Sequence, residues 1–171
     1  KLIAGIMRPT CGTVRVQGSI APLIEINGGF DRTLSGRENI YLAGAMHGHT
    51  PAYMDSRFRE IVDFAELWEF IDVPVAGYSS GMLSRLGFAI ATLSDADIVI
   101  ADEVLSVGDA RFRQKCEARM SEMLREGVTI LFVSHSAAQV QKICRRAIWL
   151  DRGQVRMDGS SGEVCRAYET R

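Results

Sequence analysis

The sequence predicts an α/β protein in which a mostly parallel sheet is interrupted by a helical insertion. Two short apolar runs, residues 98–101 and 129–133, are continuous and rich in β-branched side chains, which is typical of strands buried on both faces. The segment between them has helical spacing, so the three pieces predict a βαβ unit with a right-handed crossover. The sequence before this unit, roughly residues 37–93, is rich in helical patterns.

Length and composition are those of an ordinary globular protein. The chain has 171 residues, is 47% hydrophobic and 24% charged, and carries a formal net charge of −1. This balance argues against disorder and against a nucleic-acid protein held by a broad basic surface. No apolar run reaches the roughly 20 residues that a membrane-spanning helix needs. We expect one domain, residues 1–171, with a core of its own.

The N-terminal part predicts a small antiparallel β piece. Residues 13–17 and 20–25 have strand patterns and lie on either side of Gly18. Helices follow within the insertion, at residues 36–48, 51–70 and 80–93.

The second half continues the alternation of strand and helix. Apolar side chains between the two buried runs recur at steps of 4, 4 and 3 residues, at Phe112, Cys116, Met120 and Met123. Gly127 lies where this helix should stop.

The C-terminal part predicts a hairpin and a last helix. Residues 148–151 and 154–157 flank Gly153 as the two strands of a hairpin. Ser160, with Glu163 three residues later, predicts the capping box of the helix that follows.

The cysteines and histidines do not predict a metal site. Their spacings fit neither a zinc site nor a redox pair, so we expect reduced, mostly buried thiols. The residues are Cys11, Cys116, Cys144, Cys165, His47, His49 and His135.

Polar side chains follow the two buried strands, at the sheet edge where open α/β proteins bind ligands. Asp102 and Glu103 end the first strand, and His135 follows the second. Taken alone, the carboxylates are best explained by a helix N-cap with a solvated acid, and a histidine after a strand is most often structural.

A third candidate opens the helix at residues 80–93. Ser79, Ser80, Gly81 and Met82 combine small side chains with a helix N-terminus, whose backbone N–H groups suit an anion such as phosphate. The simpler interpretation is a serine N-cap, and Arg85 on the same helix is then a solvated charge.

Taken in order, these pieces resemble the motifs of the nucleotide-binding domain of ATP-binding cassette (ABC) ATPases. The resemblance covers essentially the whole chain and implies a P-loop NTPase (RecA-like) core with a helical signature subdomain at residues 37–93. The implied signature motif, which contacts ATP bound to a second copy, is Ser79, Ser80, Gly81 and Met82. The implied D-loop, which couples two nucleotide sites, is Ser106, Val107, Gly108 and Asp109.

The resemblance also assigns catalytic roles. It implies that Asp102 holds Mg²⁺ through water and that Glu103 orients the attacking water. His135 is then the switch histidine that contacts the γ-phosphate. The region of the glutamine loop contains no glutamine, and Glu25 is the nearest candidate for that position.

Departures from the commonest signature narrow the family. Ser80 and Met82 replace glycine and glutamine, and residues 29–40 and 102–109 are similar to the ATP-binding subunits of bacterial exporters of polysaccharides and polyol phosphates. That branch includes O-antigen, capsule and teichoic-acid exporters. The resemblance implies ATP and Mg²⁺ as ligands, a homodimer, and an integral-membrane permease as partner, with no nucleic acid. It places the protein at the cytoplasmic face of the bacterial inner membrane.

One expected motif is missing from the sequence. A P-loop needs Gly-x-x-x-x-Gly-Lys-Ser/Thr, and none of the lysines, Lys1, Lys115 and Lys142, has this context. The first residues resemble the helix that follows a P-loop, so we expect the chain to begin just downstream of that motif. The sequence leaves two alternatives open, namely a permease-free ABC ATPase acting on DNA or the ribosome, and an inactive fragment. We expect weak or no ATP binding by these residues alone.

Overall fold

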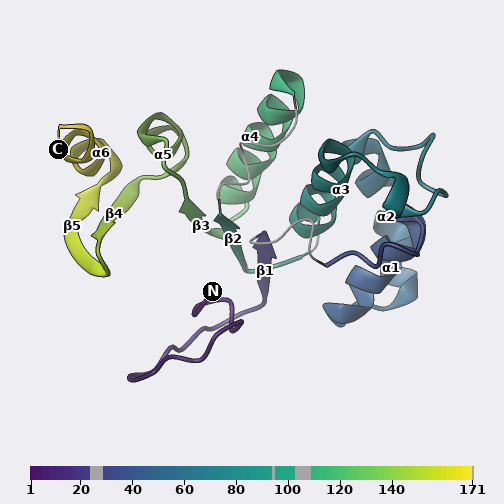
Figure 1. The fold of residues 1–171 in the computed structure, drawn as a ribbon, viewed down its shortest axis with the longest axis horizontal. Helices are drawn as coiled ribbons and strands as arrows, with labels where there is room; N and C mark the ends of the chain where they lie inside the picture. Colours follow the sequence, from purple (N-terminus) through teal and green to yellow (C-terminus); the bar gives the residue numbers. More distant parts are fainter. Residues whose placement is uncertain (24–28, 94, 103–108, 171) are drawn as a thin grey trace.

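The computed structural model describes residues 1–23, 29–93, 95–102 and 109–170. Figure 1 shows the helices of residues 36–93 at one end, the parallel sheet in the middle, and a hairpin with the C-terminal helices at the other end. This is an α/β fold with a three-stranded parallel sheet and a two-stranded antiparallel pair. None of the described helices has both the length and the apolar character needed to cross a membrane.

The central sheet confirms the predicted βαβ unit. Its strands run parallel in the order β1 (Ile20–Leu23), β2 (Ile98–Asp102) and β3 (Thr129–Val133), and α4 (Ala110–Arg125) connects the last two. The middle strand β2 buries Val99, Ile100 and Ala101. The edge strand β3 is only half-buried, because no described strand pairs with its other side.

A hydrophobic cluster joins the sheet to α3 and α4. The helical spacing of the sequence puts four apolar side chains on the buried face of α4, where they meet one face of β1 and β2. We call this the sheet cluster; it consists of Ala21, Leu23, Phe88, Val99, Ala101, Phe112, Cys116, Met120 and Met123. Burial raises the pKa of the Cys116 thiol to about 12, so this thiol stays protonated. All four cysteines are free, as predicted, although Cys11 is exposed.

The three helices of the insertion begin where the sequence predicts. They are α1 (Gly36–Met46), α2 (Pro51–Ala65) and α3 (Ser80–Leu93). Ser35 and Glu38 form a capping box at α1, and Thr50 caps α2. The predicted helix over residues 51–70 is wrong at its end. Glu66 adopts a left-handed backbone with φ of 59°, which a right-handed helix cannot continue.

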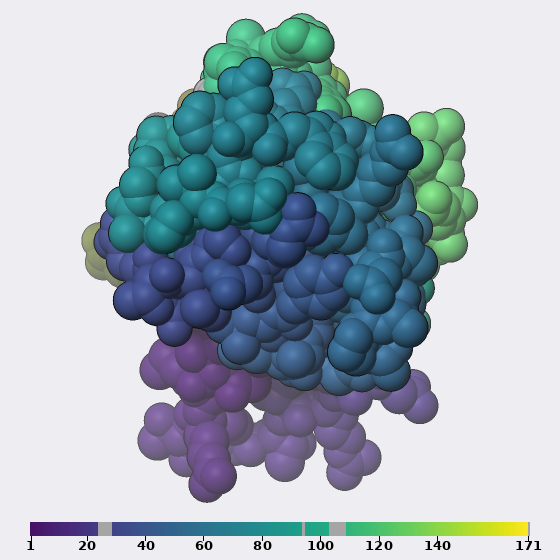
Figure 2. Space-filling model, turned by 90° about the vertical axis from the view of Figure 1, so that its right-hand side faces the viewer, coloured from purple at the N-terminus to yellow at the C-terminus, as the bar shows by residue number. Residues whose placement is uncertain are grey.

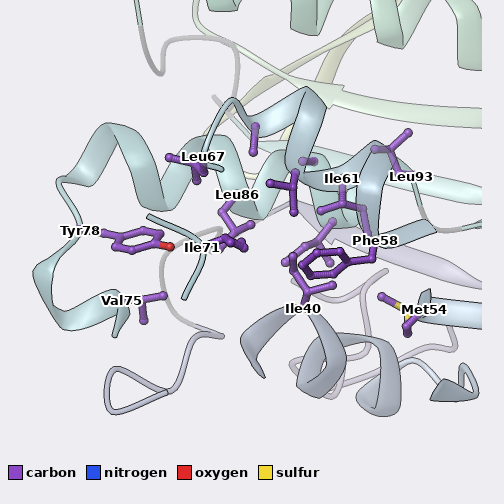
Figure 3. Close-up of a cluster of buried hydrophobic side chains, with 14 residues drawn as sticks. Ile40, Met54, Phe58, Ile61, Leu67, Ile71, Val75, Tyr78, Leu86 and Leu93 are labelled. Carbon is purple, nitrogen blue, oxygen red and sulfur yellow. The ribbon is translucent and has the colours of Figure 1, made fainter. Parts of the chain in front are cut away.

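These helices share a hydrophobic core of their own (Figure 3). Its buried side chains come from α1, α2, α3 and the connection that contains the 3₁₀ helix η1 (Val75–Gly77). We call it the helical cluster; it consists of Ile40, Met54, Phe58, Ile61, Val62, Ala65, Leu67, Ile71, Val75, Tyr78, Leu86, Ala89, Ile90 and Leu93. Phe64 of α2 packs against both clusters and stacks on Phe88, with 5.8 Å between ring centroids.

The predicted antiparallel β piece at the N-terminus is wrong. Residues 13–17 form no strand and are exposed, and Figure 2 shows the N-terminal residues projecting below the helices. The strand after Gly18 pairs in parallel with β2 instead. Ser19 explains this choice, because its backbone N–H and its hydroxyl donate to the Asp97 carboxylate at 2.7 and 2.8 Å. These bonds hold the start of β1 beside the start of β2.

The C-terminal unit confirms the predicted hairpin and last helix. The strands β4 (Arg146–Asp151) and β5 (Gln154–Ser160) pair antiparallel. Ser160 caps α6 (Ser161–Glu169), which packs against the hairpin and α5 (Ala137–Ile143).

A buried amide fixes the loop that leads into α1. Asn39 is 1% exposed. Its side-chain N–H₂ lies within hydrogen-bond distance of the carbonyl oxygens of Asp31, Leu34 and Ser35 at 3.0, 3.2 and 2.9 Å. Its carbonyl oxygen accepts from the Asp31 N–H at 2.8 Å. One side chain therefore satisfies several backbone groups of the loop.

Replacing Asn39 should therefore destabilise the protein. In Asn39→Ala the Asp31 N–H loses its acceptor, and the loop carbonyls keep only their backbone hydrogen bonds. We expect the free energy of unfolding to fall by about 1–3 kcal/mol. Urea unfolding followed by circular dichroism measures this. Arg59→Ala, at a side chain 87% exposed on α2, is the control and should change stability by less than about 0.5 kcal/mol. Equal stability of the two variants would contradict the role of Asn39.

Candidate functional site

The N-terminus of α3 is an exposed, serine-capped helix start. The Ser79 hydroxyl accepts from the Met82 N–H at 3.2 Å, and the Ser79 carbonyl accepts from the Leu83 N–H at 3.0 Å. Ser79 and Ser80 are exposed, whereas Gly81 and Met82 are half-buried. The serine N-cap is therefore present. The first N–H groups of a helix have no partner within it, so an exposed start also suits an anion.

Tyr78, the residue before Ser79, is held in place by a hydrogen bond and by burial of its ring. The Tyr78 hydroxyl is directed at the Phe70 carbonyl at 2.6 Å, and the ring is buried in the helical cluster. A Cβ atom at Gly36 would overlap the Tyr78 hydroxyl oxygen, so this close approach requires glycine. The start of α1 therefore supports the start of α3.

Asp102 and His135 lie at the carboxyl ends of two neighbouring strands, β2 and β3. Asp102 is the last residue of β2, it is exposed, and the register pairs it with Val133 of β3. His135 follows two residues later and is exposed at the same carboxyl edge. The structure thus brings these two predicted site residues to one edge.

Two serines fix the turn that carries His135. The Ser134 hydroxyl donates to the Gln139 side-chain oxygen at 3.0 Å and accepts from the Ser136 N–H at 3.1 Å. Ser136 then caps α5 by accepting from the Gln139 N–H. The backbone on both sides of His135 is therefore held by local hydrogen bonds.

Asp109 caps α4 and forms an ion pair with α3. Its carboxylate accepts from the Phe112 N–H at 2.8 Å and from the Arg85 guanidinium at 2.5 Å. The Phe112 hydrogen bond, together with the positive charge of Arg85, lowers the pKa of Asp109 below its usual range. The interpretation of Arg85 as a solvated charge is wrong, since its side chain is 21% exposed and contacts two carboxylates. No sequence signal points to these partners, because they belong to other helices.

Several predicted site residues fall where nothing is described. They are Glu25, Glu103, Ser106, Val107 and Gly108, which lie outside the described residues.

We also considered a metal site and a polar groove as candidates. Within the described ranges, no group of three or more His, Cys, Asp or Glu side chains could hold a metal ion. A groove of about 690 Å³ lies between α2, the end of α3 and α4, away from Asp102. Its arginines are engaged, since Arg57 and Arg119 bond the carbonyl oxygens of Leu93 and Thr92. We therefore centre the candidate site on the carboxyl edge of the sheet and the start of α3.

Solved structures show which class of protein has this fold. The structure of an ATP-binding subunit of an ABC transporter matches 99% of this chain and 75% of its own, with a TM-score of 0.87 and 22% identity. A dimeric post-hydrolysis state of the ATP-binding cassette MJ0796, bound to ADP and Pi, matches 84% of this chain and 63% of its own, with a TM-score of 0.71 and 20% identity. The chain has the α/β fold of ABC ATPases.

Sequence relatives then show the family, although no family model matches the chain. The O-antigen export system ATP-binding protein RfbB of Klebsiella pneumoniae is 45% identical over 168 residues, which are 98% of this chain and 68% of RfbB. The teichoic acids export ATP-binding protein TagH of Bacillus anthracis is 46% identical over 98% of this chain and 30% of TagH. The chain belongs to the ATP-binding proteins of ABC transporters of the O-antigen and teichoic-acid export type.

The lowered pKa of Asp109 predicts how its contribution to stability depends on pH. A carboxyl group with a depressed pKa in the folded state stabilises above its ordinary pKa, about 3.9, and this contribution is lost as the pH falls through the lowered value. Asp109→Asn keeps a capping side chain but loses the charge. We expect the variant to be less stable at pH 7 and the difference to shrink below about pH 4.

Urea unfolding of both proteins across this pH range measures the difference. Asp109→Ala serves as the control, because it also loses the cap and should therefore remain less stable than wild type at low pH. A difference between wild type and Asp109→Asn that grows on acidification would contradict the assigned ion pair.

Proposed function

We propose that this chain is the nucleotide-binding part of an ATPase subunit that powers export of a polysaccharide or a lipid-linked glycan or polyol phosphate across the bacterial inner membrane. The observation that carries the proposal is the sequence similarity to O-antigen and teichoic-acid export ATP-binding proteins, which extends over 98% of the chain. In this proposal two copies form a homodimer that binds ATP, docks to an integral-membrane permease and works at the cytoplasmic face.

The candidate site supports a division of roles within such a dimer. We assign the exposed start of α3, with Ser79, Ser80, Gly81 and Met82, to the ATP bound by the other copy. Glu103 orients the attacking water, and His135, whose turn is fixed by serines on both sides, contacts the γ-phosphate. Asp109, with Ser106, Val107 and Gly108, couples the two sites. Glu25 takes the position of the glutamine loop.

Magnesium fits the residues at the sheet edge. Proteins usually bind this ion with one or two carboxylates, while water and substrate phosphates supply the other ligands. Asp102 provides one exposed carboxylate at the end of β2. When bound with ATP, the ion supplies charge neutralisation at the β- and γ-phosphates.

We also propose how the chain is divided. Residues 37–93 act as a helical subdomain within one nucleotide-binding domain, residues 1–171, and the helical cluster supports this because it is separate from the sheet cluster.

In the intact protein, we propose that a phosphate-binding segment adds a strand beside β3. The half-buried side chains of β3, with Val133 at 53% exposure, leave that position open among the described residues.

Glu103→Gln in the intact transporter tests the catalytic assignment. The amide cannot accept the proton of the attacking water, so we expect ATP binding to be retained while turnover falls by about 10²–10⁴-fold, the usual contribution of a general base. Binding is measured by titration with labelled ATP, and turnover by phosphate release. Glu60→Gln, on the exposed surface of α2, is the matched control. Normal steady-state hydrolysis by Glu103→Gln would overturn the role of Glu103.

Cells that carry Glu103→Gln as their only copy test the transport function. We expect the surface polymer to disappear and its lipid-linked precursor to accumulate inside, as detected by immunoblotting of surface and membrane fractions. The protein should co-purify from membranes with an integral partner. Recovery only with ribosomes or DNA, with normal surface polymer, would instead favour an ABC ATPase without a permease.

A further inference from the structure

Three helices meet at the side chain of Arg85. On α3, its guanidinium contacts the Asp109 carboxylate at the start of α4 at 2.5 Å and the Glu66 carboxylate at the end of α2 at 3.2 Å. The same guanidinium lies over the Phe112 ring, 4.9 Å from its centroid. Arg85 therefore joins α3 to its neighbours through two carboxylates and one aromatic face.

The second carboxylate is itself held in place. Glu66 has a left-handed backbone, which is costly for a residue other than glycine. Its carboxylate also accepts from Lys115 at 3.1 Å, and the hydrogen bond from Lys115 lowers the pKa of Glu66. Lys115 is fixed in turn by the Phe64 carbonyl at 2.8 Å. The carboxylate that Arg85 contacts at the end of α2 is therefore also held by Lys115 of α4.

We propose that Arg85 is a positioning residue that fixes Asp109 relative to the N-terminal end of α3. This inference rests on the proposed function, in which the start of α3 contacts ATP on the other copy and Asp109 couples the two sites. Arg85 lies on the helix that begins at Ser80, so closure of the α3 start on nucleotide carries the guanidinium and its partner Asp109 along. The expected consequence is that Arg85 transmits closure at one site to the other.

A second arginine offers a matched comparison at the other end of α3. Arg119 of α4 donates to the Thr92 carbonyl at 3.0 and 3.3 Å, and its side chain is 15% exposed. It joins the same two helices with a similar degree of burial, but its carboxylate partners are Glu122 and Glu126 rather than Asp109. Losing either arginine should therefore weaken the α3–α4 packing, whereas only Arg85 should affect the coupling of the sites.

The experiment compares Arg85→Lys and Arg119→Lys in the intact transporter. Lysine keeps the charge but is a single point donor, so it cannot hold two carboxylates as the guanidinium fork does. We expect Arg85→Lys to lower the Hill coefficient for ATP hydrolysis from about 2 toward about 1, the limits for two coupled and two independent sites. We expect kcat to fall with it, while KM changes by less than about twofold, because ATP contacts are unchanged. Arg119→Lys should keep the Hill coefficient of wild type, although thermal unfolding should show that both variants lose stability.

A double variant tests whether Arg85 acts through Asp109. If it does, Arg85→Lys combined with Asp109→Asn lowers the Hill coefficient no further than either change alone. A wild-type Hill coefficient in Arg85→Lys, or an equal loss in Arg119→Lys, would overturn this inference while leaving the proposed function intact. Absence of ATP hydrolysis by the wild-type transporter would overturn both.

Discussion

The parallel pairing of β2 with β1 and β3 is the constraint on which the candidate site depends. Because all three strands run in one direction, their carboxyl ends meet at one edge, and the register that pairs Asp102 with Val133 brings His135 to the same edge. Burial of Val99, Ile100 and Ala101 fixes the middle strand, and the sheet cluster holds α4 against it. The position of Asp109 follows from this packing, since it caps that helix.

The helical group and the sheet are joined by both apolar and polar contacts. Each has its own apolar cluster, but Phe88 of α3 belongs to the sheet cluster and Phe64 of α2 packs against both. Around it, Arg85, Lys115 and Arg119 connect α3 or α2 to α4 through carboxylates and backbone carbonyls. Hydrogen bonds and ion pairs are directional, whereas apolar burial is not. The polar contacts therefore add direction to a joint that Phe64 and Phe88 already pack.

Local patterns predicted most of the fold, and long-range pairing explains the errors. The limits of α3 and the βαβ unit follow from periodicity and caps that neighbouring residues supply. Residues 13–17 have a strand pattern but form no strand, and the strand after Gly18 pairs in parallel with β2 instead, where Ser19 binds Asp97, which is distant in the sequence. The sequence does not indicate the end of α2, because Glu66 takes a conformation usually reserved for glycine. Within the site, the order of motifs was readable, but the role of Arg85 was not, since its partners lie on two other helices.

The half-buried edge strand β3 has a consequence for how these residues behave in solution. A row of N–H and C=O groups that pairs with no described strand, beside an exposed Val133, is a template onto which another strand can add. As long as that edge stays uncovered, we expect the edges of two copies to pair with each other and self-association to rise with concentration. A strand that covers the edge of β3 would therefore keep the protein soluble as well as complete the sheet.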